Sequence, residues 1–352
     1  MPLIRRRFVS GRCPAFIGLW LLLCACAPSV LTAQPTASAS PTASPPVQPM
    51  HATSAPTSPQ WGTATVALVR PATPVFGSFD PARVRDIKLD DYPIVPTISP
   101  AARAIYQAGL ARGNNPRVFS KLGDCMTENP YFLVTFSGGH YDLGSYPELQ
   151  SVLNQYWGVP ARSGNWKLDS FATTGLAAAA GFNIAGPLDA TWADPKWCLG
   201  GESPAACEFR VARPSLALIM FGTNDVAFTD PATYDYYMRS LIDQALNSGV
   251  LPVLSTFPTR PEDPAKSLLL NQIVVRVATD YQIPLVNLNR AIEPLPNHGV
   301  NPADTIHLSV PPDGRVDRFT PDELQYGFTM RNLVTLQALG AVLNAVTDHT
   351  HT

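Results

Sequence analysis

The run Ser215-Leu-Ala-Leu-Ile-Met-Phe221, followed at once by Gly222-Thr223-Asn224-Asp225, decides the fold of this chain. An uncharged, almost entirely apolar run of this length indicates a strand buried on both faces, as in a parallel sheet. The polar turn that follows puts Asn224 where the strand ends. Functional sites of open parallel sheets gather at the carboxyl ends of strands, so this turn is a candidate for one.

Strand-like and helix-like segments alternate on both sides of this run. Strands are expected over residues 117–122, 166–171, 215–221, 250–256 and 284–288, and helices over 100–111, 147–156, 234–247 and 265–281. The capping-box sequence Thr320-Pro321-Asp322-Glu323 predicts a long C-terminal helix that ends near Val346. This alternation predicts an α/β fold with three αβα layers and a parallel sheet of about five strands.

The charge of the chain excludes some partners. The 352 residues carry a formal net charge of −2, and no basic stripe or RNA-binding signature is present. We therefore expect no nucleic-acid partner. The sequence also contains no zinc-ligand spacing, so neither a metal nor another cofactor is expected.

The N-terminus is typical of an export signal. Arg5, Arg6, Arg7 and Arg12 precede an apolar run over residues 15–25, which is too short to span a bilayer comfortably. Leu23-Cys24-Ala25-Cys26 resembles a bacterial lipobox, with Cys26 as the lipid-bearing residue, although Cys24 is unusual there. Plain secretion with cleavage after Ala33, a weak twin-arginine motif and an uncleaved membrane anchor are the alternatives. The lipobox and its alternatives all place the mature domain outside the cytoplasm. The lipobox also implies a membrane anchor through the lipid on Cys26.

The remaining organisation follows from composition. Residues 1–26 form the predicted leader, and residues 27–60 a disordered linker of mostly Pro, Ser, Thr and Ala. Residues 61–114 are expected to be an extension packed on the domain, residues 115–346 the domain itself, and residues 347–352 a tail. Residues 182–213, with two Trp and two Cys, are interpreted as an insertion near the site that could form a partial lid.

The mature domain has three cysteines, so at least one of them has no partner for a disulfide within the domain. In an oxidising compartment two of Cys125, Cys198 and Cys207 are expected to pair, and the nine-residue separation favours a disulfide between Cys198 and Cys207. Cys125 is then a free thiol. The alternative is that Cys125 itself is bonded to one of the other two.

Four short motifs occur in a fixed order: Gly123-Asp124-Cys125, then Gly175, then Gly222-Thr223-Asn224-Asp225, then Asp304-Thr305-Ile306-His307. Over about residues 115–346 the chain resembles the SGNH hydrolases, also called the GDSL esterase/lipase superfamily. The resemblance implies a flavodoxin-like αβα fold and acyl-ester hydrolysis. It departs from the family pattern at Cys125, where the family nucleophile is a serine.

The resemblance also implies a role for each residue. Cys125 is the nucleophile, His307 the general base, and Asp304 the acid that orients the imidazole. The oxyanion donors are the Cys125 N–H, the Gly175 N–H and the Asn224 side chain, with Gly181 and Gly186 as rivals of Gly175. The start of a helix at Cys125 is expected to lower its pKa. Asp124 and Asp225 are interpreted as turn residues, and His140 as a loop residue.

Three functions remain open at this point. The first is a cysteine-dependent acyl hydrolase or transferase that acts on small acyl, lipid or polysaccharide esters. The second is a non-catalytic, carbohydrate-binding surface protein with a degenerate nucleophile. The third is a redox or disulfide-forming role for Cys125. Nothing in the sequence selects a substrate or an oligomeric state.

Overall fold

The computed structural model of the chain describes residues 76–164 and 166–347. The predicted leader, Cys26 and the linker 27–60 lie outside these residues. The described residues all belong to one compact unit. Every helix in the described part of this unit is too short or too polar to cross a membrane.

The centre of the unit is a parallel sheet with the strand order β1-β2-β3-β4. Its strands are β1 (Asn115–Gly123), β2 (Pro214–Met220), β3 (Leu251–Ser255) and β4 (Leu285–Val286). Every residue of β2 is buried, as its apolar run predicts. The register pairs Gly123 with Met220, so β1 and β2 end side by side. The turns that carry Cys125 and Asn224 therefore leave the same edge of the sheet.

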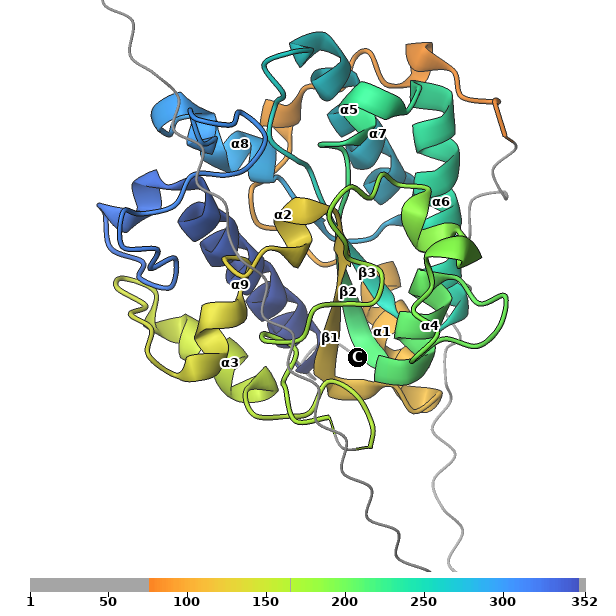
Figure 1. Cartoon of the computed structure of the whole chain (residues 1–352), viewed down its shortest axis with the longest axis vertical. Helices are drawn as coiled ribbons and strands as arrows, with labels where there is room; N and C mark the ends of the chain where they lie inside the picture. Colours follow the sequence, from red (N-terminus) through yellow and green to blue (C-terminus); the bar gives the residue numbers. More distant parts are fainter. Residues whose placement is uncertain (1–75, 165, 348–352) are drawn as a thin grey trace, which may run out of the picture. The chain divides into compact units, whose positions relative to one another are not determined.

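Helices cover both faces of the sheet, which confirms the three-layer αβα fold. One group, α4 (Pro204–Ala212), α6 (Pro231–Asn247) and α7 (Pro264–Tyr281), packs in succession and against β1 and β3. The other group is α1 (Pro100–Ala111), α3 (Gln150–Tyr156) and α9 (Gly327–Thr347). Figure 1 shows α3 and α9 to the left of the strands and α4 and α6 to the right. Two shorter helices, α5 (Asp225–Phe228) and α8 (Leu288–Ile292), follow β2 and β4.

The prediction of about five strands is wrong, because the described sheet has four. Residues 166–171, the expected second strand, are all described and form no strand. Their polar groups bond the edge of β1 in another way: the Ser170 hydroxyl accepts the Phe119 N–H at 2.9 Å, and the Phe171 carbonyl accepts from Lys121 Nζ at 2.8 Å. Further along the chain, Ala178 forms an isolated bridge to Gly123. An irregular segment therefore covers this edge of the sheet.

Residues 182–213 are not only an insertion, because they contain α4. Ser203 caps this helix and Pro204 begins it, a signal that the sequence does carry. The buried carboxylate of Glu208 binds the Arg162 guanidinium at 3.1 Å and the Ser120 hydroxyl at 2.6 Å, which ties α4 to β1. The predicted disulfide between Cys198 and Cys207 is present, so the alternative in which Cys125 is bonded is wrong.

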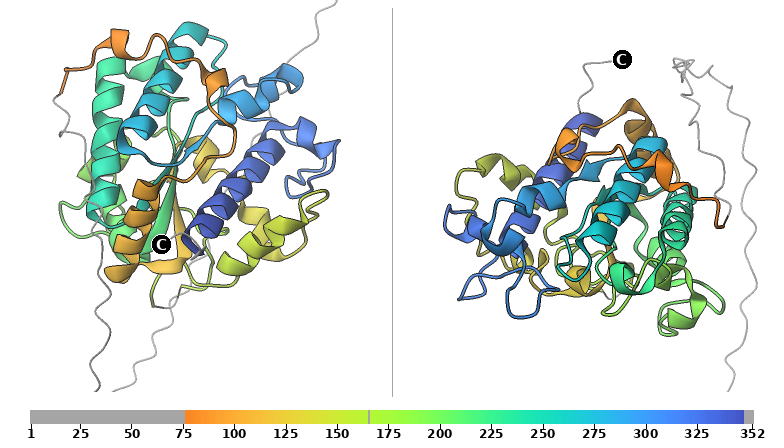
Figure 2. Two further views of the ribbon diagram at one scale, coloured as in Figure 1. Left: turned by 180° about the vertical axis from the view of Figure 1, so that it is seen from behind. Right: turned by 90° about the horizontal axis from the view of Figure 1, so that it is seen from above.

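The segment before α1 runs along α7 and α8, as the left view of Figure 2 shows. It is held by its carbonyl groups: Gln272 Nε2 donates to Ile87 at 2.9 Å, and Asn287 Nδ2 donates to Leu89 at 2.7 Å and to Tyr92 at 3.1 Å. These buried amides anchor the described part of the segment, residues 76–99, which contains no strand.

The C-terminal helix begins later than its predicted capping box. The Thr320 hydroxyl bonds the Glu323 carboxylate itself, instead of capping a backbone N–H, and only a 3-10 turn (Glu323–Gln325) follows. Helix α9 starts at Gly327, whose N–H donates to the Ser309 hydroxyl at 2.9 Å. An added Cβ at Gly327 would lie 2.0 Å from the Gly299 carbonyl oxygen, so this close packing requires glycine.

Candidate active site

The nucleophile position lies at the end of β1. Asp124 caps the short helix α2 (Cys125–Glu128) by accepting the Met126 N–H at 3.0 Å, and this places Cys125 at the first position of the helix. No acceptor within the described residues takes the Cys125 N–H. The Cys125 N–H is therefore a candidate oxyanion donor, and this assignment stays a prediction.

The environment of the Cys125 thiol differs from the prediction. Burial, followed by the neighbouring Asp124 carboxylate, raises the pKa of the Cys125 thiol to about 11. The expectation of a lowered pKa is wrong, because α2 has only four residues and cannot offset desolvation. At neutral pH the thiol keeps its proton, so attack by sulfur requires a base.

We expect alkylation of Cys125 by iodoacetamide to accelerate about tenfold per pH unit from pH 8 to pH 10, since only the thiolate reacts and its fraction keeps rising below the pKa. Peptide mass mapping would measure the rate at this residue, with Cys125→Ala as the control for other cysteines. A rate that levels off below pH 9 would show that the thiol is more acidic than its burial implies.

The second element of the site is the Asn224 turn, residues 221–224, which follows β2. Asn224 Nδ2 donates one hydrogen bond to the Phe182 carbonyl at 2.8 Å. An amide nitrogen carries two hydrogens, so one remains available for an oxyanion. Asp225 is buried and accepts from the Ile184 N–H and the Thr229 hydroxyl, which fixes the turn. This agrees with its interpretation as a bracing residue.

The third predicted oxyanion donor, Gly175, makes no backbone hydrogen bond with Cys125 in the described structure. An added Cβ at Gly175 would lie 2.0 Å from the Lys121 carbonyl oxygen, so Gly175 packs on β1 two residues before Gly123. Gly123 instead bonds Ala177 and Ala179, which follow Gly175 in the chain. Further along, Gly181 adopts a φ of +81° just before the Phe182 carbonyl that binds Asn224. The Gly175 assignment stays a prediction, and its rival Gly181 adjoins the residue that binds Asn224.

The base lies on a loop closed by a bridge between Val300 and Leu308, which we call the base loop (residues 300–308). His307 Nδ1 and Asp304 Oδ2 are 3.2 Å apart, and Asp304 Oδ1 accepts the His307 N–H at 2.9 Å. Desolvation alone would raise the pKa of the Asp304 carboxyl, but the N–H groups that donate to this carboxylate hold its pKa below the usual value. Asp304 is thus ionised and fixes the orientation of the imidazole.

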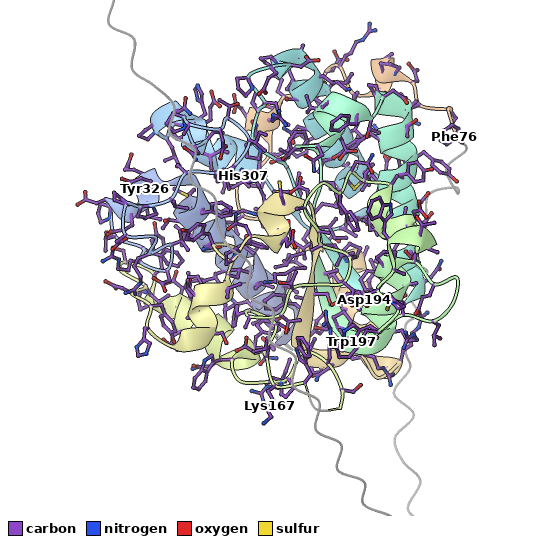
Figure 3. All side chains as sticks on the ribbon, viewed as in Figure 1. Phe76, Lys167, Asp194, Trp197, His307 and Tyr326 are labelled. Atoms are coloured by element: carbon purple, nitrogen blue, oxygen red, sulfur yellow. A yellow bond between two sulfur atoms is a disulfide. The ribbon has the colours of Figure 1, made fainter. Side chains whose placement is uncertain are left out.

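The base loop and α2 face each other. Figure 3 shows His307 next to α2, and His307 is close enough to be among the groups that influence the pKa of the Asp124 carboxyl, the neighbour of Cys125. No hydrogen bond joins the Cys125 thiol to His307 in the described structure. Such bonds often form only once a substrate is bound. By contrast, Asp194 and Trp197 lie toward the opposite end of the strands, so this part of residues 182–213 does not cover the site.

Sequence analysis missed a buried cation beneath the nucleophile. Arg331 of α9 donates to the Met126 carbonyl at 2.6 Å and to the Thr127 hydroxyl at 3.0 Å, and its guanidinium stacks 3.6 Å from the Phe132 ring centre. Burial lowers the pKa of Arg331 to about 9, against the opposing effect of Asp124. An arginine in the middle of an apolar helix is the signal that could have identified it.

Two other candidates are His140 and a group of possible metal ligands. His140 is an exposed loop residue, as predicted. In the part of the chain that the structure describes, the residues grouped closely enough to hold a metal are Cys198, Glu202 and Cys207. Two of them form the disulfide, so this group offers no metal site.

The fold and the site together define a class of protein. A three-layer αβα fold places a thiol, a histidine oriented by an acid and an asparagine amide at the carboxyl ends of the strands of its sheet. This is the class of α/β ester hydrolases. A family model described as the GDSL-like Lipase/Acylhydrolase family matches residues 122–311, more than half of the chain. The chain belongs to this family, which confirms the resemblance seen in its motifs.

Solved structures of related proteins are similar at low identity. A lipase/acylhydrolase from Enterococcus faecalis is 17% identical, with 64% of this chain and 95% of that chain covered and a TM-score of 0.40. A GDSL-like lipase from Bacteroides thetaiotaomicron is 15% identical, with 68% and 96% covered and a TM-score of 0.35. A psychrotrophic esterase, EstA, from Pseudoalteromonas sp. is 11% identical, with 66% and 100% covered and a TM-score of 0.39. No curated protein matches the chain.

Proposed function

We propose that this ester hydrolase uses the thiol of Cys125 as its nucleophile, with His307 as the base and Asp304 as the orienting acid. The observation that carries the proposal is the free Cys125 at the end of β1, while Cys198 and Cys207 are bonded to each other. A single unbonded thiol at the family's nucleophile position, opposite an acid-paired histidine, suits acyl transfer.

The proposed reaction has two halves. His307 takes the thiol proton as Cys125 Sγ bonds to the ester carbonyl carbon, and it passes that proton to the departing alkoxide, which leaves an acyl thioester. Water then attacks the thioester, His307 takes a proton from the water, and the sulfur departs with that proton as the acid is released. Because the pKa of the thiol is raised to about 11, proton removal accompanies attack instead of preceding it.

Negative charge on the carbonyl oxygen needs donors that are already in place. The Cys125 N–H and the second hydrogen of Asn224 Nδ2 are the two that the contacts support best. A backbone N–H from Gly175 or Gly181 would supply the third. Small acyl esters are the expected substrates, and an acceptor other than water would turn the same intermediate toward acyl transfer.

We expect Asn224→Ala to lower kcat by about 10²–10³-fold, because loss of one oxyanion donor removes about 2.7–4 kcal/mol of transition-state stabilisation. Initial rates on a cleaved ester would measure the change. Asn183→Ala is the control, since its side chain bonds Thr229 beside the same turn. A similar loss in both variants would mean that Asn224 acts by holding the turn instead.

The test of the function is a panel of short acyl esters and thioesters, assayed for release of alcohol or thiol before and after Cys125 is blocked with iodoacetamide. The proposal requires release that blocking abolishes. Release that survives blocking contradicts it. Binding of an ester without any release would favour the non-catalytic alternative, which the raised pKa of Cys125 and its missing bond to His307 keep open.

We also propose that the enzyme works outside the cytoplasm, held at the cell envelope by a lipid on Cys26 or secreted after cleavage. The basic and apolar leader supports this proposal, as does a disulfide between Cys198 and Cys207, since such bonds persist in oxidising compartments. Metabolic labelling with a fatty acid, compared between the wild type and Cys26→Ala, distinguishes the anchored form from the secreted form.

A further inference from the structure

Two charged residues between β3 and α7 touch both sides of the site, and neither has a role in the reaction described so far. Arg260 Nη1 donates to the Thr223 carbonyl at 2.9 Å, and Thr223 immediately precedes Asn224. Arg260 Nε donates to Glu262 Oε2 at 3.0 Å. The other carboxylate oxygen, Glu262 Oε1, accepts from the Thr305 hydroxyl at 3.0 Å.

These bonds join three separate loops. The Asn224 turn supplies a carbonyl, the segment after β3 supplies the ion pair, and the base loop supplies a hydroxyl. The Arg260 side chain is only 13% exposed, so its guanidinium is well fixed, whereas that of Glu262 is 52% exposed. The hydrogen bond to Arg260 is the largest of the effects that lower the pKa of Glu262 to about 2, so its carboxylate is charged throughout the range in which an esterase is assayed.

Thr305 is the strained member of this chain of contacts. Its φ of +56° lies in the left-handed region, which is strongly disfavoured for a β-branched residue. Such strain persists only where the surroundings impose it, and it concentrates at functional sites. Thr305 lies between Asp304 and His307, so its backbone sets the direction in which both side chains leave the base loop. The bond to Glu262 is a side-chain contact that holds it from outside the loop.

We propose that Arg260 and Glu262 are positioning residues, which fix the base loop relative to the Asn224 turn so that the base and the oxyanion donor meet the same substrate. This inference rests on the proposed function, since it assigns both loops to one reaction. It goes beyond the four motifs, because neither residue lies in any of them. Glu262 is half exposed, and an ion pair with a solvent-exposed partner contributes little to stability, so the effect is expected on catalysis and not on folding.

The experiment is a double-mutant cycle with Glu262→Ala and Thr305→Val, which keeps the β-branched shape and removes only the hydroxyl. Each single variant is expected to lower kcat about tenfold, or about 1.4 kcal/mol, with KM unchanged within about twofold, because geometry in the reaction step is lost while ground-state binding is not. The double variant is expected to be no slower than Glu262→Ala alone, since that variant already removes the contact with Thr305 along with the Arg260 ion pair. Thr305→Ser keeps the hydroxyl and is expected to retain the kcat of the wild type.

Glu202→Ala is the matched control, because Glu202 forms a similar ion pair with Arg210 in the disulfide-containing segment. It is expected to leave kcat unchanged. Unchanged kcat in Glu262→Ala or Thr305→Val, or losses that multiply in the double variant, would overturn the inference.

Amide hydrogen exchange separates this inference from the proposed function. Faster exchange of the base loop in Glu262→Ala and Thr305→Val, but not in Glu202→Ala, supports the positioning role of Arg260 and Glu262. This holds even if the wild type cleaves no ester, an outcome that would refute only the proposed function. Equal exchange of the base loop in all variants contradicts the positioning role, whatever the activity.

Discussion

Replacing Cys125 by alanine is expected to lower kcat on the order of 10⁶-fold, the scale on which loss of a nucleophile acts in a coupled catalytic set. The variant retains His307, Asp304 and the Asn224 amide, but it has no atom that can form the acyl intermediate. Initial rates on the best ester of the panel would measure the loss. Circular dichroism would confirm that the variant is folded.

Cys125→Ser is the informative partner of this variant, because it restores the residue that the family layout carries. We expect it to retain measurable turnover, since His307 and the donors are arranged as for a serine and no thiolate is preformed at neutral pH. An alanine variant that turns over ester at the rate of the wild type would show that the sulfur has no part in the reaction.

Replacing His307 by alanine is expected to lower kcat by about 10⁴-fold at pH 7, at the upper end of what a positioned base contributes. The reason is specific to this site: with the thiol pKa raised to about 11, almost no thiolate exists at pH 7 without a base. The loss is therefore expected to shrink about tenfold per pH unit as the pH rises toward 11 and solvent hydroxide forms the thiolate. Rates measured from pH 7 to pH 10 would show this slope.

His140→Ala is the control for the loss of a histidine, because His140 is exposed in a loop outside the site. It is expected to leave kcat unchanged at every pH. A His307→Ala variant that retains more than about a tenth of the activity at pH 7 would mean that another group removes the proton.

Much of the fold could be predicted because its signals are local. The apolar run before Gly222 is a buried strand, and Ser99-Pro100 begins a helix where its capping pattern indicates. The prediction failed where side chains replace backbone pairing. Ser170 binds the edge of β1 through its hydroxyl, so no strand forms there. Thr320 bonds the side chain of Glu323, so the last helix starts at Gly327.

The candidate site could be predicted only in its motifs. Asp304 and His307 are close in sequence, and their contact follows from the spacing. The raised pKa of Cys125 depends on burial, which no local pattern reports. Arg331 lies more than 200 residues from the helix that it supports, and the contact between Glu262 and Thr305 joins loops 43 residues apart. These contacts exist only because the sheet brings its carboxyl ends together.

The central claim is that Cys125 carries the acyl group, and intact mass measurement of the protein during turnover tests it most directly. After rapid mixing with a short acyl thioester and acid quenching, we predict a mass increase of one acyl group, located by peptide mapping to Cys125 and absent from Cys125→Ala. Ester turnover with the acyl group on a different residue, or undiminished turnover without Cys125, would contradict the account.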